Sequence, residues 1–349
     1  METRIRRLCI AAAAALCLLV VAGCATPPVG PGPTGAAVVS ALKLDRALEE
    51  RILALDPDRI TPDDVKNTLA RGPVPRIILV HGGIFPVHLF MESFGEFLTG
   101  MGYPEARIRH PGDRRWSHSP YENSAQIAGF AAWAYEHDGM MPLLIGHSQG
   151  GIQVVKVLRE LDGAYGDRVS VWNPLTDASD GRTTIEDPLT GRERPVRGLT
   201  LSYASAAAAG GAALMLPNQW SMIGNVRAVP DTVEEFTGYS IVFDTWAWTG
   251  GVSDDNEFRP AGKARVRNVE LPWTYNHVVF PVSSDFPKDP DVRAWIEAYT
   301  PAQAKGPAPL QAEGRSVLWA ADVWFSVRRH WCLEAQQLIR AHRAALGGG

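Results

Sequence analysis

Several kinds of functional motif are missing from the sequence. It has no spacing of His, Cys, Asp and Glu that is typical of a metal site and no phosphate-binding loop. No G-x-G-x-x-G fingerprint follows a strand pattern, so a bound dinucleotide is not indicated. We therefore expect no metal and no other cofactor.

Cysteine is scarce, with four residues in a chain of 349. Only Cys332 lies beyond residue 24, so the body of the chain has no second thiol for an internal disulfide. Cys332 stands in an apolar helical pattern, Trp331-Cys332-Leu333, where a buried and unreactive thiol is the usual outcome.

An excess of positive charge is missing as well. The chain has 34 basic and 38 acidic residues, and residues 1–23 carry three Arg and one Glu. Without that segment 31 basic and 37 acidic residues remain, a net charge of about −6 with His neutral. Nucleic-acid binding usually needs a basic surface, so we expect no nucleic-acid partner.

The amino terminus has the layout of an export signal. Arg4, Arg6 and Arg7 precede an uninterrupted apolar run, Leu8–Ala22. The run has 15 residues. A helix needs roughly 20 to cross the hydrocarbon core, so we expect a cleaved signal peptide at residues 1–23 and not a permanent membrane span.

The end of this run, Val21-Ala22-Gly23-Cys24, resembles the bacterial lipobox. The resemblance implies acylation of the Cys24 thiol and a lipid-anchored protein on the periplasmic side of the cell envelope. Ala25, which is not Asp, favours the outer membrane. An ordinary signal peptide is the alternative. Residues 24–36, rich in Pro and Gly, are expected to form a tether.

A helical segment is predicted at residues 37–72, before the main domain. Leu48 and Ile52 belong to a run spaced as one helix face, and Thr61-Pro62 begins a cap with an acidic first turn. The sequence has no internal repeat, and we expect one main domain at residues 73–349.

Buried strands alternate with helices in this domain. Ile77–Val80 and Pro142–Ile145 are short apolar runs that suit strands covered on both faces, and a helical pattern lies between them. This alternation predicts an α/β fold with a mostly parallel sheet flanked by helices. Functional residues are then expected at the carboxyl ends of the strands.

A G-x-S-x-G motif follows the second of these strands. It reads Gly146-His147-Ser148-Gln149-Gly150 and is followed by Gly151 and a helical pattern. A sharp strand-to-helix turn of this kind needs glycines for close approach and exposes the serine hydroxyl. Ser148 is therefore the candidate nucleophile.

This motif in its context resembles the α/β-hydrolase superfamily, in particular lipase-like and esterase-like members whose motif reads Gly-His-Ser-Gln-Gly. The resemblance covers roughly residues 74–300. It implies an α/β-hydrolase fold and the order Ser, acid, His along the chain. It also implies oxyanion donors from the loop after an earlier strand.

The oxyanion donors are assigned on that resemblance. His81-Gly82-Gly83-Ile84 follows the earlier strand, and we assign the first donor to the amide of Gly83, with Ile84 as the alternative. The amide of Gln149 would be the second donor. His81 is expected to brace its turn, and His147 to act as a spacer that points away from the Ser148 hydroxyl.

His277 is the expected base. It comes about five residues after a predicted last strand, Arg265–Leu271, and before a helical pattern, as the resemblance implies. Other histidines would break the family order because they precede Ser148 or lie in the C-terminal helix. These are His88, His110, His118, His137 and His330.

The acid is expected near the end of the penultimate strand, which is predicted at Tyr239–Phe243. Asp244 follows that strand and is preferred, while Asp254 and Asp255 in the next loop are the alternatives. A carboxylate here would orient the imidazole and stabilise its protonated form. Solvated or helix-capping carboxylates would be the structural explanation for any of the three.

Several segments are expected around the cleft. An excursion is predicted at residues 162–197 and a C-terminal helix at residues 318–346, and the small residues Ala206–Gly211 lie near the site or pack on the sheet. Four tryptophans either form aromatic walls that suit an apolar substrate or pack in the core. They are Trp220, Trp246, Trp248 and Trp273.

Together these features predict a lipid-anchored serine hydrolase, most simply a carboxylesterase or lipase-like enzyme acting on an ester with an apolar acyl group. Ser148, His277 and Asp244 would act through an acyl-enzyme without a cofactor. A periplasmic acyltransferase with the same triad is one alternative. A non-catalytic lipoprotein that binds lipid or another protein is the second.

Overall fold

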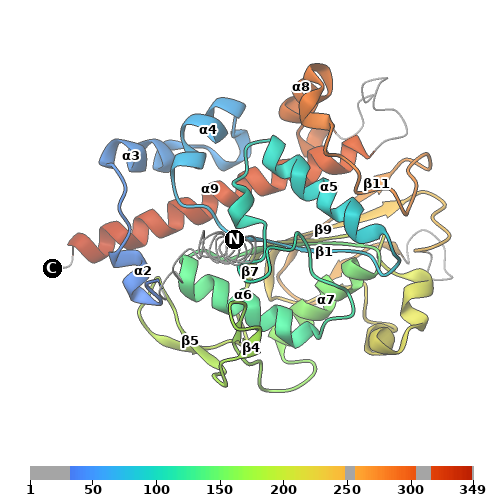
Figure 1. Ribbon diagram of the computed structural model, residues 1–349, viewed down its shortest axis with the longest axis horizontal. Helices are drawn as coiled ribbons and strands as arrows, with labels where there is room; N and C mark the ends of the chain where they lie inside the picture. Colours follow the sequence, from blue (N-terminus) through green and yellow to red (C-terminus); the bar gives the residue numbers. More distant parts are fainter. Residues whose placement is uncertain (1–31, 248–255, 304–315, 348–349) are drawn as a thin grey trace, which may run out of the picture. The chain divides into compact units, whose positions relative to one another are not determined.

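A central sheet of five strands organises the protein (Figure 1). The computed structural model describes residues 32–247, 256–303 and 316–347, and the chain from Thr34 onward forms one compact unit. All pairings between neighbouring strands of the sheet are parallel, which confirms the predicted α/β fold. In spatial order the strands are β1 (Ile77–Val80), β2 (Leu143–His147), β7 (Leu201–Ala207), β9 (Val233–Ile241) and β11 (Arg265–Leu271).

The central strands are buried on both faces. Every residue of β1, β2 and β7 is buried, as continuous apolar runs in a parallel sheet require. Side chains alternate between the two faces along a strand. Ile77 and Leu79 therefore enter one hydrophobic cluster, and Ile78 and Val80 enter the other.

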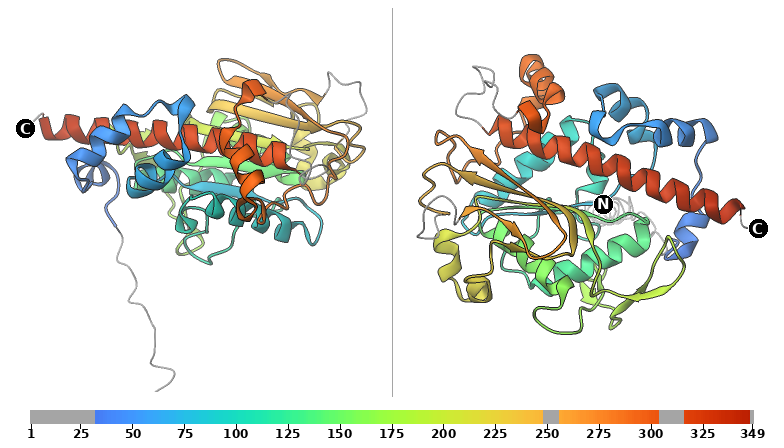
Figure 2. Two further views of the ribbon diagram at one scale, coloured as in Figure 1. Left: turned by 90° about the horizontal axis from the view of Figure 1, so that it is seen from above. Right: turned by 180° about the vertical axis from the view of Figure 1, so that it is seen from behind.

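Helices cover both faces of the sheet (Figures 1 and 2). The cluster of Ile77 and Leu79 includes residues of α5 (Val87–Gly100), α8 (Pro290–Ala298) and α9 (Val317–Gly347). The opposite cluster includes α6 (Ser124–Asp138) and α7 (Gln149–Asp162). Because all five strands are parallel, the loops that follow them lie at the same edge of the sheet.

The bounds of the penultimate strand differ from the prediction. The apolar run Tyr239–Phe243 predicts only the second half of β9, which begins at Val233 and ends at Ile241. Phe243 has φ of 59°, which a strand residue cannot adopt, and its side chain is exposed. The first half was missed because Glu234 and Glu235 interrupt its apolar pattern.

The residues before β1 form α2 (Ala36–Ser40), α3 (Arg46–Ala54) and α4 (Pro62–Asn67). At α4 the predicted cap is present, since the Thr61 and Asp64 side chains each bond the other residue's main chain. This segment is tied to α9, where the Gln336 side chain donates to the carbonyls of Ile52 and Leu55.

The excursion after α7 contains two short antiparallel hairpins. One pairs β3 (Trp172–Asn173) with β4 (Ala178–Ser179), and the other pairs β5 (Thr184–Glu186) with β6 (Glu193–Pro195). Both hairpins lie in the excursion predicted at residues 162–197, for which the sequence predicts no strand bounds. The second, β5 to β6, carries the exposed charged residues that hide its apolar pattern.

The C-terminal helix α9 extends the predicted range by one residue at each end. Cys332 is buried in it, and burial raises the pKa of its thiol to about 12. No helix among the described residues is long and apolar enough to cross a membrane. Residues 1–31, with the predicted signal and Cys24, lie outside the described part of the chain.

Candidate active site

Ser148 occupies a sharp turn between β2 and α7. Its φ of 56° and ψ of −124° are rarely adopted by a residue with a side chain. The flanking glycines allow the turn: a Cβ on Gly150 would collide with the main chain of Val80 and His81. One on Gly146 would collide with Gly150. The turn leaves the Ser148 side chain on the wall of a pocket.

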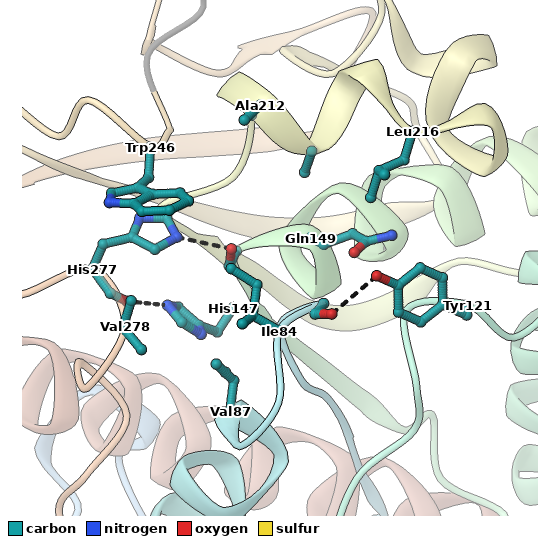
Figure 3. Close-up of a pocket in the computed structure, with 14 residues that line it drawn as sticks. Ile84, Val87, Tyr121, His147, Gln149, Ala212, Leu216, Trp246, His277 and Val278 are labelled. Carbon is teal, nitrogen blue, oxygen red and sulfur yellow. Dashed lines mark hydrogen bonds between the residues drawn. The ribbon is translucent and has the colours of Figure 1, made fainter.

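His277 meets this hydroxyl from the loop after β11. The Ser148 Oγ lies 2.8 Å from Nε2 of His277 (Figure 3). Since the other ring nitrogen donates to a carboxylate, Nε2 is the acceptor and the hydroxyl donates to it. The structure thus places the expected base in hydrogen-bond contact with the expected nucleophile.

Asp244 completes the chain of hydrogen bonds. Its Oδ2 lies 2.6 Å from Nδ1 of His277, while its Oδ1 accepts the main-chain N–H groups of Trp246 and Ala247. The carboxylate is 5 % exposed, so these donors take the place of water. Asp244 lies three residues beyond the end of β9. The alternatives, Asp254 and Asp255, lie outside the described residues.

Other histidines are engaged elsewhere. His118 bonds Glu122 at 2.7 Å and packs against His110, and His137 bonds its own helix through the Trp133 carbonyl. His330 stacks on a tyrosine in the core under α9. These contacts agree with the exclusion of these histidines on chain order.

Two main-chain amides converge beside Ser148. Gln149 is the first residue of α7, so its N–H has no acceptor within the helix. Gly83 lies on the same pocket wall. No described residue accepts a hydrogen bond from either N–H. A Cβ at Gly83 would collide with the end of the Gln149 side chain, so that carboxamide would have to move. Both amides are therefore available to a negatively charged oxygen.

Two side chains hold the loop that carries Gly83. His81 donates from Nδ1 to the Gly82 carbonyl at 2.7 Å, and Tyr121 donates from its hydroxyl to the Gly83 carbonyl at 2.9 Å. Because a peptide unit is planar and trans, fixing the Gly82 carbonyl fixes the opposite direction of the Gly83 N–H. His81 thus braces its turn. The sequence offers no local signal for Tyr121, 38 residues away.

His147 does not reach the Ser148 hydroxyl. Its ring is fully buried, and Nε2 lies 2.8 Å from the main-chain oxygen of His277 (Figure 3). Burial holds the pKa of His147 well below 6.5, so the ring is neutral. The sequence predicts a spacer here and gives no sign of this bond to the loop that carries His277.

The pocket above Ser148 has a volume of about 260 Å³. Its walls are mainly apolar: Val87 and Val278 lie below the reacting groups, and Leu216 lies beside Gln149 (Figure 3). Trp246 lies against the His277 ring and lines the pocket, although about half of its surface is exposed, and Trp220 and Trp273 are exposed as well. Trp248 lies outside the described residues. Gly210 lines the pocket from the predicted small-residue run, whose first residues belong to β7.

No protein-family model matches the chain, and no curated protein matches it. The described residues contain no group of three or more His, Cys, Asp or Glu side chains that could hold a metal ion. The chemistry of the site therefore has to be inferred from its own residues.

Proposed function

We propose that the protein is a serine hydrolase of the α/β-hydrolase superfamily that cleaves carboxylic esters. One observation carries the proposal: Ser148, His277 and Asp244 form a continuous hydrogen-bonded chain with links of 2.8 and 2.6 Å, at the floor of an apolar pocket. A nucleophile, its base and the group that orients the base are the minimum set for acyl transfer.

In the first half of the reaction His277 Nε2 takes the proton from the Ser148 hydroxyl as Oγ attacks the ester carbonyl carbon. The carbonyl oxygen becomes negative and accepts hydrogen bonds from the amides of Gly83 and Gln149. This tetrahedral intermediate then collapses and breaks the bond between the acyl carbon and the alcohol oxygen, and that oxygen receives the proton from Nε2. The products are an acyl group on Ser148 and a free alcohol.

In the second half water replaces the alcohol. His277 takes a proton from water, the hydroxide attacks the acyl carbon, and the same two amides hold the oxyanion. When this second intermediate collapses, the bond between the acyl carbon and Ser148 Oγ breaks. His277 returns the proton to Oγ, and the carboxylic acid is released. Asp244 stabilises the imidazolium in both halves without taking the proton.

The lining of the pocket supports an ester with an apolar acyl group. The leaving alcohol must lie near His277, because His277 protonates it. The acyl group therefore extends to the other side of Ser148. On that side Leu216 and Tyr121 line the pocket (Figure 3). Burial of hydrocarbon against such a surface contributes roughly 25 cal/mol per Å².

The test is covalent labelling of the purified domain with a fluorophosphonate, with the adduct located by mass spectrometry and a short-chain ester assay alongside. We expect the adduct on Ser148 and loss of both labelling and turnover in Ser148→Ala. Ser221→Ala is the matched control, because that serine is exposed on a neighbouring segment. Absence of label and turnover in the wild type would favour a binding lipoprotein. Transfer of the acyl group to an added alcohol, in preference to water, would identify an acyltransferase.

We further propose that the domain is held on the cell envelope by a lipid on Cys24. The support is the basic, apolar and Val-Ala-Gly-Cys succession at the amino terminus. Mass spectrometry of the amino-terminal peptide from a membrane fraction tests this, with Cys24→Ser as the comparison. A wild-type peptide without added lipid mass would contradict the proposal.

A further inference from the structure

The loop that carries His277 must span a long distance to reach Ser148. His277 follows β11, whereas Ser148 follows β2, and β7 and β9 lie between these strands in the sheet. Three strand spacings of about 4.8 Å each amount to about 14 Å. The loop must therefore cross the ends of two strands and be held at its far end.

His147 holds the loop at this far end. Its Nε2 lies 2.8 Å from the main-chain oxygen of His277. A carbonyl oxygen only accepts, so Nε2 carries the proton and Nδ1 does not. Nδ1 is buried and has no hydrogen-bond partner among the described residues. Leaving a buried nitrogen unpaired costs stability, so the ring is oriented for its bond at Nε2.

The surroundings of the ring fix its direction. The His147 ring stacks on Phe280, with centroids 5.5 Å apart and planes at 28°, and Phe280 packs on Trp319 of α9 with centroids 4.6 Å apart. These contacts hold the His147 ring, and with it the Nε2–H donor, in one orientation. The hydrogen bond therefore joins the loop of His277 to a ring that is held by the turn at Ser148 and by the core under α9.

Without His147, the His277 residue would be held mainly through its ring. The bonds to Ser148 and Asp244 lie at the two nitrogens and leave the imidazole free to pivot about the line through them. Trp246 stacks on the ring with centroids 6.3 Å apart, and a contact to the main chain of residue 277 limits this freedom further. Among the described residues, the donor to the main-chain carbonyl of His277 is His147.

We propose that His147 is a positioning residue for catalysis: its Nε2–H fixes the main chain of His277 and thereby aims the imidazole at Ser148. This inference rests on the proposed hydrolase function. His147 borders the pocket but its ring is fully buried, so its loss is expected to lower the rate of acyl transfer more than the binding of the ester. A misplacement of about 1 Å at such a group costs on the order of 100-fold in rate.

Four substitutions separate the hydrogen bond from packing. His147→Gln keeps a donor at the reach of Nε2, whereas His147→Asn has the same amide but is too short to reach the His277 carbonyl. His147→Met and His147→Phe fill the space without a donor. We expect kcat for a short-chain ester to fall about 10- to 100-fold in the Met, Phe and Asn variants with KM within about twofold. The Gln variant should recover most of the lost rate.

Thermal unfolding of each variant is measured beside the kinetics, and the comparison is made well below the lowest midpoint. If the apolar variants do not fold, the Asn and Gln pair still decides the question. Wild-type kcat in the Asn or Met variant would overturn the inference, and so would a folded Gln variant as slow as Asn. Failure of the wild type to react with a fluorophosphonate would instead overturn the proposed hydrolase function.

Discussion

The two oxygens of Asp244 have different partners: Oδ2 lies 2.6 Å from Nδ1 of His277, and Oδ1 receives two main-chain N–H groups of its own loop. Asp244 follows β9 and His277 follows β11, and these two strands are neighbours in the sheet. The main-chain donors fix the carboxylate, so the carboxylate can fix the imidazole. This relationship makes Asp244 the acid of the proposed triad.

Asp244→Asn should lower kcat by about 10³- to 10⁴-fold, because an amide in this place favours the wrong imidazole tautomer and does not stabilise the imidazolium. Steady-state ester hydrolysis measures the loss. Asp254→Asn and Asp255→Asn are the matched controls and should keep near wild-type rates. A large loss in either control, with Asp244→Asn still active, would move the acid to the next loop.

Gly83→Ala should lower kcat by about 10²- to 10³-fold, the usual effect of losing one oxyanion donor. The new Cβ collides with the end of the Gln149 side chain, and we expect relief of this collision to shift the loop that carries the Gly83 N–H. Ester kinetics and the rate of fluorophosphonate labelling should fall together. A folded variant with full activity would show that the oxyanion lies elsewhere.

Asp322→Ala should destabilise the protein by about 3–5 kcal/mol, because it breaks a buried ion pair. The buried Asp322 carboxylate accepts from both terminal nitrogens of Arg267 at 2.7 Å and from the hydroxyls of Tyr239 and Tyr299 at 2.6 Å. Urea unfolding measures the change. Asp167→Ala is the control, since Asp167 pairs with an arginine at the surface and should cost less than about 1 kcal/mol. Equal effects would contradict the assigned role.

Glu334→Gln should stabilise the protein at alkaline pH. Burial raises the pKa of Glu334 from 4.5 to about 7. The folded state therefore keeps a proton that the unfolded state releases, and stability falls as pH rises from about 4.5 to about 7. Glutamine is uncharged and still accepts the N–H of Met141, which lies 2.7 Å from the carboxylate.

Denaturant unfolding of the wild type and Glu334→Gln at pH 4 and pH 8 tests this. We expect the variant to gain roughly 1–3 kcal/mol over the wild type at pH 8 and little at pH 4. Taking the difference between the two proteins removes the contribution of other titrating groups. The same difference at both pH values would mean that Glu334 does not titrate in this window.

The parts of the fold and site that were predicted well are those that leave a local pattern in the sequence. Ile77–Val80 is β1 and Arg265–Leu271 is β11 with the predicted bounds, because apolar runs and a closing proline mark them in the chain. Ser148 was found because its turn needs glycines at fixed positions. His277 was predicted from the family order and from its place between the predicted last strand and a helical pattern, and the structure brings it to Ser148.

Contacts between distant loops could not be predicted. The bond from Tyr121 to the Gly83 carbonyl and the bond from His147 to the His277 carbonyl depend on where loops lie in space. Neither leaves a periodic or spaced pattern in the sequence. The start of β9 was missed for a related reason, since Glu235 faces Arg329 of α9 and looks like a solvated charge when read alone.

The outer strand of the sheet, β11, is closed off by a side chain. Asn268 accepts the N–H of Phe258 and donates to its carbonyl, both at 2.9 Å, so one carboxamide bonds the segment before the strand as a neighbouring strand would. Arg265 and Glu270 add charge along the same strand. An open strand edge invites pairing with another molecule and aggregation. Asn268 and the segment that it holds thus cover part of the β11 edge and leave less of it open to pairing with a strand of another chain.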